Sequence, residues 1–225
     1  VLSIGVGKIK TIVCTPGGFL VPVVGSSAAH ELVFNKGISF DACLEFLVAE
    51  EYAMLDCISE GRLVAGFPVG LGGDFSYSYG FAPMEQRERF REAHDLITKA
   101  WTADDVFTWN GKYCQLPMVN LWPQPMQKPH PPIWVPGNSS PTTWDFVLEH
   151  DYSYCHLSYF GAKGADSNVG GYWRRAEELG RDTNPYRMGY LMPVGVAETD
   201  AAADEIYAPH IEYFYHKLLH VPDQF

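Results

Sequence analysis

Short apolar runs alternate with longer segments of helical periodicity along the chain, and this alternation restricts the fold more than any other feature. The runs with strand character are Ile9–Val13, Leu63–Phe67, Ile133–Val135, Tyr152–Leu157 and Met188–Val196. The segments with helical spacing are Phe40–Ile58, Pro83–Trp101, Thr142–His150, Val169–Leu179 and Asp200–His220. Such alternation predicts βα units with right-handed crossovers and a parallel sheet. We therefore expect an α/β fold, either an open doubly wound sheet or a (β/α)8 barrel.

Two stretches interrupt this pattern. The segment FTWNGKYCQL, which starts at Phe107, predicts a β-hairpin with its turn at Asn110 and Gly111. Eight of the chain's 16 prolines lie between Pro117 and Pro141, so this region is expected to be extended and rigid. The pattern between residues 21 and 37 is too weak to predict an element.

Composition and charge exclude several classes of protein. Hydrophobic residues make up 47% of the 225 residues, which is enough for a packed core. The 16 basic and 27 acidic residues give a formal net charge of -11, which argues against nucleic acid or an anionic membrane as a partner. Arg87, Arg89 and Arg91 are interleaved with glutamates, as on the solvated face of a helix.

The cysteines and histidines give no sign of a metal site. The 5 cysteines are widely spaced and form no CxxC pair, so we expect neither a disulfide framework nor a zinc site. His216 and His220 lie four residues apart on an expected helix but lack a clear third ligand. Neither a membrane-spanning run nor a signal peptide is apparent, and the expected location is the cytoplasm.

The stretch PPIWVPGNSSPTTWDF, over Pro131–Phe146, joins a strand to a helix through a loop rich in hydroxyl groups. Pro141 in the first helical turn, with Ser140 before it, marks the start of the helix. A helix N-terminus carries unpaired backbone N–H groups and a positive dipole end, so hydroxyls there suit an anion such as phosphate. The alternative is that Ser139 or Ser140 only caps the helix.

Five segments in this order resemble the bacterial luciferase-like flavin-dependent monooxygenases: AEEYAMLDCISEGRLVAGF, RERFREAHDLITKAW, FTWNGKYCQL, WPQPMQKPHPPIWVPGNSS and VAETDAAADE. They span roughly Ala49–His220, whereas residues 1–48 match poorly. The resemblance implies one TIM-type (β/α)8 barrel domain over residues 1–225, incomplete or shortened, with N-terminal βα units and the barrel end missing. An incomplete barrel leaves strand edges open, so the chain is expected to form a homo-oligomer unless it is a fragment of a longer protein.

The resemblance also implies a function. It predicts a monooxygenase that uses reduced FMN, supplied by a partner flavin reductase, and O2 to oxidise a small organic substrate. The alternatives are hydride transfer with the deazaflavin F420 and flavin binding without catalysis. The residues that match the family's phosphate loop are Gly137, Asn138, Ser139, Ser140, Thr142 and Thr143. Luciferases proper carry a Cys-Arg pair where this chain has Pro68 and Val69, so that arginine contact is absent.

Other candidates lie near the expected ligand face. The glycine-rich loop GFPVGLGG, over Gly66–Gly73, carries neither a P-loop nor a dinucleotide-binding pattern, and it is expected to be either a flexible loop beside the flavin or an ordinary loop. His156 is interpreted as a site residue or a core histidine. Tyr154, Tyr159 and Phe160 either line an apolar pocket or simply pack. The sequence does not indicate the catalytic residues.

Overall fold

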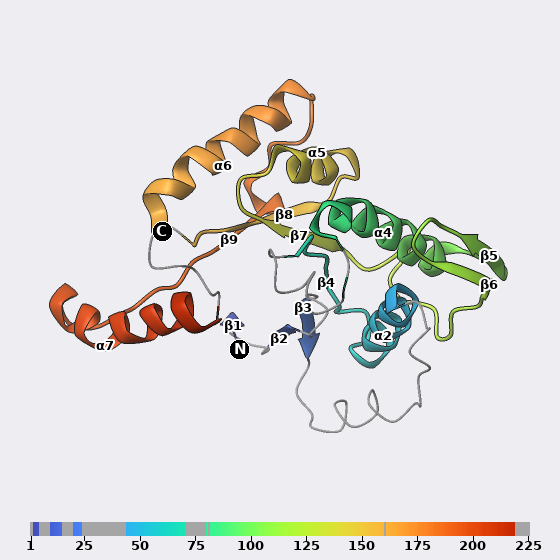
Figure 1. The fold of residues 1–225 in the computed structure, drawn as a ribbon, viewed down its shortest axis with the longest axis horizontal. Coiled ribbons are helices and arrows are strands. Elements are labelled where there is room, and N and C mark those ends of the chain that lie inside the picture. Colours follow the sequence, from blue (N-terminus) through green and yellow to red (C-terminus); the bar gives the residue numbers. More distant parts are fainter. Residues whose placement is uncertain are drawn as a thin grey trace. The chain divides into compact units, whose positions relative to one another are not determined.

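The structure is a computed structural model that describes residues 2–4, 10–14, 20–23, 44–70, 80, 82–159 and 161–218 (Figure 1). The chain divides into two compact units, Val1–Tyr154 and Cys155–Phe225, and each is described by itself. The single domain expected over residues 1–225 stays a prediction.

The sheet of the first unit combines antiparallel and parallel pairing. Its strands, in spatial order, are β1 (Leu2–Ile4), β2 (Lys10–Cys14), β3 (Leu20–Val23), β4 (Ala65–Gly66) and β7 (Ile133–Gly137). The pairs from β1 to β4 are antiparallel, whereas β4 and β7 are parallel, with Ala65 opposite Ile133. The expected strands at β2, β4 and β7 are confirmed. The sequence pattern predicted neither β1 nor β3.

The parallel pair β4–β7 is buried, as the continuous apolar runs predict. The Ala65 N–H donates to the Pro132 carbonyl at 2.8 Å, and the Phe67 N–H donates to the Trp134 carbonyl at 2.9 Å. The core side chains of the two segments are Leu63, Ala65, Phe67, Ile133 and Val135. Burial on both faces fixes this register, because a slip by one residue would expose the apolar side chains.

Two long helices precede β7 in the sequence. The helix α2 (Leu44–Ile58) packs against α4 (Gln86–Thr102), which follows the short 3-10 helix η1 (Pro83–Glu85) (Figure 1). The indole N–H of Trp101 donates to the Ala49 carbonyl at 3.0 Å and so joins the helices directly. Both helices match the segments that the apolar spacing predicts.

The β-hairpin expected from FTWNGKYCQL consists of β5 (Phe107–Asn110) and β6 (Gln115–Val119). It lies along α4, whose Glu92 carboxylate accepts hydrogen bonds from the backbone N–H groups of Lys112, Tyr113 and Cys114 at 2.8–3.0 Å. Four residues, Gly111 to Cys114, connect the two strands, whereas the Asn-Gly pair predicts a two-residue turn. A carboxylate from another element thus holds this turn, in addition to the local hydrogen bond from the Gly111 N–H to the Cys114 carbonyl at 2.9 Å.

The helix α5 (Pro141–Glu149) directly follows β7, as predicted. It packs against α4 through Phe146, whose ring centroid lies 5.1 Å from that of Phe90. The next strand, β8 (Ser153–Leu157), begins in the first unit and ends in the second.

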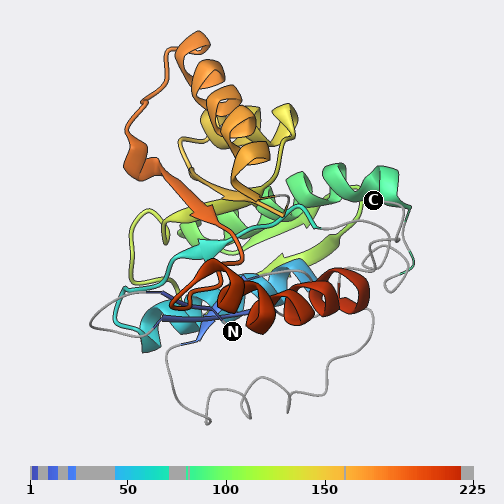
Figure 2. The same cartoon turned by 90° about the vertical axis from the view of Figure 1, so that its left-hand side faces the viewer.

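The second unit continues with α6 (Gly161–Glu178), the 3-10 helix η2 (Pro185–Arg187), β9 (Met188–Leu191), α7 (Asp200–Tyr213) and a π-helical turn, η3 (Phe214–Leu218). The strands β8 and β9 are neighbours, and the Ser158 N–H donates to the Leu191 carbonyl at 2.8 Å. The helix α6 begins before the predicted Val169. In both views α7 lies apart from α6, and it buries no side chain (Figure 2).

Two sequence expectations about the chain as a whole can be compared with this structure. Among the described helices, none has the length and apolar character needed to cross a membrane. Cys57 and Cys155 are free thiols, as expected. Cys114 differs from that expectation, because it is disulfide-bonded.

Candidate functional site

The N-terminus of α5 has an uncapped geometry. Ser140 occupies the N-cap position with extended backbone (φ -84°, ψ 113°), and its side chain makes no capping hydrogen bond. Its carbonyl oxygen accepts from the N–H groups of Thr143 at 3.0 Å and Trp144 at 3.1 Å. The Ser140 hydroxyl instead accepts a hydrogen bond from Arg87 Nη2 at 2.9 Å. Capping by Ser140, one of the two alternatives from the sequence, is therefore wrong.

Three more hydroxyl groups gather at this helix start. Within the described residues, the side chains of Ser139, Thr142 and Thr143 make no hydrogen bond. Ser139 and Thr142 are exposed, whereas Thr143 is only 5% exposed. The Thr142 N–H, at the second helical position, likewise has no acceptor in the described part of the chain. The site thus offers free donors at the positive end of a helix dipole.

The loop before α5 is held tightly against β8. The Tyr154 hydroxyl donates to the Asn138 carbonyl oxygen at 2.6 Å, and the Tyr154 side chain is fully buried. A Cβ atom at Gly137 would lie 3.2 Å from both Thr143 Cγ2 and Tyr154 Cε2. Gly137 therefore permits close packing of the loop, and Tyr154 fixes its backbone.

Arg87 is a site residue that the sequence interpretation missed. It lies in the first turn of α4, and its guanidinium reaches the start of α5. The neighbouring Gln86 donates from Nε2 to the Val69 carbonyl at 2.8 Å, so this turn of α4 is anchored to the segment after β4. Interleaved charges predicted a solvated face for Arg87, Arg89 and Arg91. Arg87 and Arg91 are exposed, as that prediction expects, whereas Arg89, which forms a salt bridge with Glu85, is half-buried.

Of the remaining candidates from the sequence, some lie in the second unit and others outside the described residues. His156 is 1% exposed, and its ring centroid lies 5.7 Å from that of Tyr190, as in a core histidine. Phe160, His220 and residues 71–73 of the Gly66–Gly73 loop lie outside the described residues. No group of three metal-ligating side chains is found in the part of the chain that the structure describes.

His94, Asp95 and Tyr152 form a cluster between α4 and the start of β8, and the His94 side chain is buried. His94 Nδ1 is 2.9 Å from Asp95 Oδ1, and its Nε2 is 2.8 Å from the Tyr152 hydroxyl. Burial lowers the pKa of His94, against the opposing effect of Asp95, and burial also raises the pKa of Tyr152 to about 12. A carboxylate only accepts hydrogen bonds, so the neutral His94 ring donates from Nδ1 and accepts from Tyr152. We interpret this cluster as structural.

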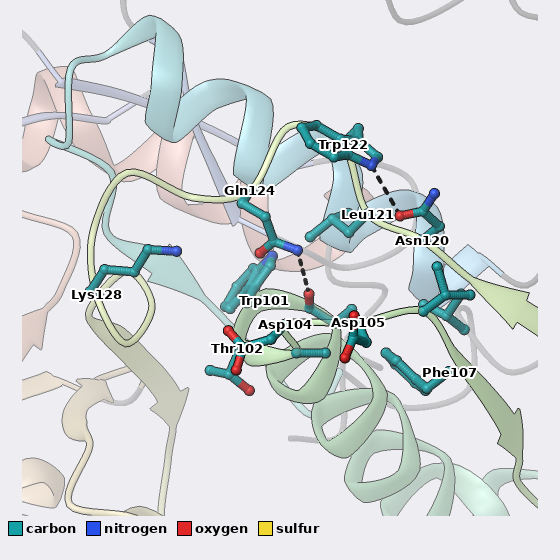
Figure 3. Close-up of a pocket in the computed structure, with 14 residues that line it drawn as sticks. Trp101, Thr102, Asp104, Asp105, Phe107, Asn120, Leu121, Trp122, Gln124 and Lys128 are labelled. Atoms are coloured by element: carbon teal, nitrogen blue, oxygen red, sulfur yellow. Dashed lines mark hydrogen bonds between the residues drawn. The ribbon is translucent and has the colours of Figure 1, made fainter.

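A pocket of about 420 Å³ lies beside the C-terminal end of α4 and the β5–β6 hairpin (Figure 3). Trp101, Leu121 and Trp122 line it, and Gln124 Nε2 donates to the Ala100 carbonyl at 3.3 Å there. None of the six residues predicted to hold a phosphate lines this pocket. It is therefore separate from the site at the start of α5, since Arg87 lies at the opposite end of α4.

The parallel pair β4–β7, followed by a polar loop and α5, defines an α/β protein whose polar groups gather beyond the carboxyl end of a strand. Comparison with known families gives the same class. The chain belongs to the luciferase-like monooxygenase family, whose model matches residues 46–223. The resemblance predicted from the five sequence segments is thus confirmed.

Individual relatives agree with this assignment. Over 176 residues the chain is 29% identical to the oxygenase component of the flavin-dependent trigonelline monooxygenase of Acinetobacter baylyi, covering 75% of this chain and 46% of that protein. Monooxygenase RslO1 from Streptomyces bottropensis matches with a TM-score of 0.67 at 22% identity, covering 79% of this chain and 54% of its own.

A second solved structure is the oxygenating constituent of 3,6-diketocamphane monooxygenase from the CAM plasmid of Pseudomonas putida, in complex with FMN. It matches with a TM-score of 0.63 at 22% identity, covering 78% of this chain and 52% of that one. These two structures establish the fold. The chain spans about half the length of the relatives it matches.

Proposed function

We propose that this chain binds the phosphate of FMN at the start of α5 and belongs to the oxygenase component of a two-component flavin-dependent monooxygenase. The observation that carries the proposal is the uncapped helix start, where three hydroxyls make no hydrogen bond in the described residues. Family membership supports it, because the oxygenase component of the trigonelline monooxygenase is named as flavin-dependent.

The groups at this helix start fit a phosphate. Ser139 and Thr142 are exposed and can donate their hydroxyl hydrogens, and the Thr142 N–H adds a backbone donor. Gly137 and Asn138 shape the loop, and Ser140 and Thr143 supply further hydroxyls beside it. The dipole of α5 favours the negative charge at the same point.

When bound, reduced FMN would supply the electrons that activate O2. The residues of this chain would anchor its phosphate, and the rigid loop fixed by Tyr154 would hold that anchor in place. We propose further that a flavin reductase supplies the reduced cofactor and that the substrate is a small organic molecule. A homo-oligomeric state and a cytoplasmic location belong to the same proposal.

The test compares FMN with riboflavin, which lacks the phosphate. In the Ser139→Ala/Thr142→Ala double variant, the affinity for FMN should fall by about one to three decades, because two charge-assisted hydrogen bonds are lost while the backbone N–H groups and the helix dipole remain. Riboflavin should bind about as it does to the wild type. Flavin fluorescence titrations give both affinities, and a melting curve reports stability.

The matched control is Ser167→Ala/Thr183→Ala, which removes the same two hydroxyls from exposed positions in the second unit. It should leave both affinities unchanged. An unchanged FMN-to-riboflavin ratio in the Ser139→Ala/Thr142→Ala variant would rule out the phosphate site. A loss of about 1 kcal/mol of stability without a change in that ratio would indicate that these hydroxyls only stabilise the start of the helix.

The alternatives from the sequence are separated by two further measurements. Oxygen consumption with reduced FMN supports the monooxygenase. Anaerobic substrate reduction with reduced F420 supports the deazaflavin-dependent enzyme, and stoichiometric flavin retention without turnover supports a binding protein.

A further inference from the structure

The pocket at the C-terminal end of α4 has an aromatic wall with one highly exposed ring (Figure 3). Its apolar lining includes Val106, Phe107, Leu121 and Trp122. Lys99 Nζ lies 4.4 Å from the centroid of the Phe107 ring, so that ring already carries a cation. Trp122 is 75% exposed, and within the described residues no cation lies over its ring. Trp122 therefore offers an indole face to a molecule in the pocket.

The Trp122 ring is held in one orientation. Its indole N–H donates to Asn120 Oδ1 at 3.0 Å, and Asn120 also lines the pocket (Figure 3). This bond uses the polar edge of the indole and leaves its faces free. A ring that is already fixed loses little conformational entropy when a ligand packs on it. Among aromatic side chains, tryptophan attracts a cation to its face most strongly.

The charged groups that line the pocket favour a cation. Asp104 and Asp105 are exposed, and they form no ion pair in the described part of the chain. They closely follow α4, whose C-terminus is the negative end of the helix dipole. Among the described lining residues Lys128 alone is cationic, and Figure 3 shows it on the side away from Asp105. The two carboxylates and the helix end thus outweigh one ammonium group.

A buried acceptor in the same wall lacks a donor. Gln124 Nε2 donates to the Ala100 carbonyl, but Gln124 Oε1 is buried and accepts no hydrogen bond from the residues that the structure describes. A buried acceptor without a donor is unfavourable. A bound molecule that brings an O–H or N–H group to this end of the pocket would supply the missing donor.

We propose that this pocket binds a small organic cation, whose positive group lies over the Trp122 ring and beside the carboxylates of Asp104 and Asp105. The chemical class is an ammonium group on a short apolar body, which packs against Val106 and Phe107. A volume of about 420 Å³ accommodates such a molecule. The inference is independent of the proposed function, because none of the six residues proposed for the phosphate lines this pocket.

The first test uses choline as the probe. Its control ligand is 3,3-dimethylbutanol, which has a similar shape and the same hydroxyl group but no charge. Titration calorimetry gives both affinities, and the shift of the Trp122 indole N–H in a proton–nitrogen correlation spectrum reports binding at this site. Choline should move this signal and bind at least about tenfold more tightly than the alcohol. Equal affinities, or no shift with choline, would overturn the proposal.

The second test removes the ring. Trp122→Leu should weaken choline binding about five- to thirtyfold, because it removes the indole face and keeps an apolar side chain. Tyr186→Leu, which removes a ring that is 90% exposed in the second unit, should leave the affinity unchanged. Both variants should melt like the wild type, since both side chains are exposed. Wild-type affinity for choline in Trp122→Leu would overturn the proposal.

The third test removes the negative charges. Asp104→Asn/Asp105→Asn should weaken choline binding about three- to tenfold, and added salt should weaken binding to the wild type more than to this variant. The matched control, Asp166→Asn/Asp204→Asn, makes the same change in net charge at exposed positions of the second unit. It should leave the affinity unchanged. Equal losses in the two double variants would overturn the proposal, since they indicate a general effect of net charge.

Discussion

The Tyr154 hydroxyl donates a hydrogen bond of 2.6 Å to the Asn138 carbonyl oxygen, so a buried residue of β8 fixes the backbone of the loop that opens α5. Asn138 lies in the connection from β7 to α5, and Tyr154 lies in β8, the strand that follows α5. The loop with the candidate phosphate ligands is therefore held by the core and not by its own turn chemistry.

Tyr154→Phe should reduce the free energy of unfolding by about 0.5–1.5 kcal/mol, because it removes the hydrogen bond that the Tyr154 hydroxyl donates to the Asn138 carbonyl oxygen. It should also weaken FMN binding, since the loop loses its anchor. Urea unfolding and a flavin titration measure the two effects. The control is Tyr186→Phe, on a side chain that is 90% exposed, and equal stability of the two variants would contradict the prediction.

Asp56 should be required for the stability of the proline-rich segment. Its fully buried carboxylate accepts from the Gln127 backbone N–H at 2.9 Å and from Gln127 Nε2 at 2.7 Å. Asp56→Asn replaces an acceptor with a donor and should cost about 2–4 kcal/mol. Denaturant unfolding measures this cost. Asp166→Asn, at an exposed position, should have almost no effect, and a similarly small effect at Asp56 would disprove the role of this contact.

Glu92 should hold the β5–β6 turn in place. Glu92→Gln removes the charge from hydrogen bonds to three backbone N–H groups and should destabilise the protein by about 1–3 kcal/mol. Hydrogen exchange should be fastest in the hairpin, with the amides of Lys112 and Tyr113 losing protection first. Glu149→Gln, on the exposed face of α5, is the control, and unchanged hairpin protection in Glu92→Gln would refute the prediction.

His94 should make stability depend on pH. Burial lowers its pKa in the folded state below the ordinary 6.5, so the unfolded state binds a proton at a higher pH than the folded state does. The stabilisation is complete above about pH 6.5 and falls as the pH drops through it, by at most about 1.4 kcal/mol per pH unit.

Urea unfolding between pH 5 and pH 7.5 measures this slope, and His94→Gln should flatten it. His210→Gln, on the exposed surface of α7, should keep the full slope. An identical slope in wild type and His94→Gln would exclude His94 as its source.

The chain should associate with itself in solution. Within the described residues α7 buries no side chain, and Ile206 and Tyr213 are 54% and 60% exposed. Apolar surface of this kind favours association. Sedimentation velocity should show dimers or larger species, and Ile206→Glu/Tyr213→Glu should shift them toward monomer. A monodisperse monomer of the wild type would contradict the prediction.

The sequence by itself determined the order and type of most elements and the place of the candidate site. Apolar spacing marked α2, α4, α5 and the strands from β7 to β9, because these patterns depend on residues close together in the chain. The loop after Ile133–Gly137 was predicted for the same reason. Proline at the start of α5 and hydroxyls before it are local signals of a helix N-terminus.

Only the tertiary structure decided how this site is supported. Arg87 and Ser140 are separated by 53 residues, and Asp56 and Gln127 by 71, so no local window of sequence contains either pair. The antiparallel strands β1 and β3 and the long hairpin turn also depend on partners from other elements. Local periodicity specifies which face of an element is apolar, whereas the packing of distant helices specifies which polar side chains meet.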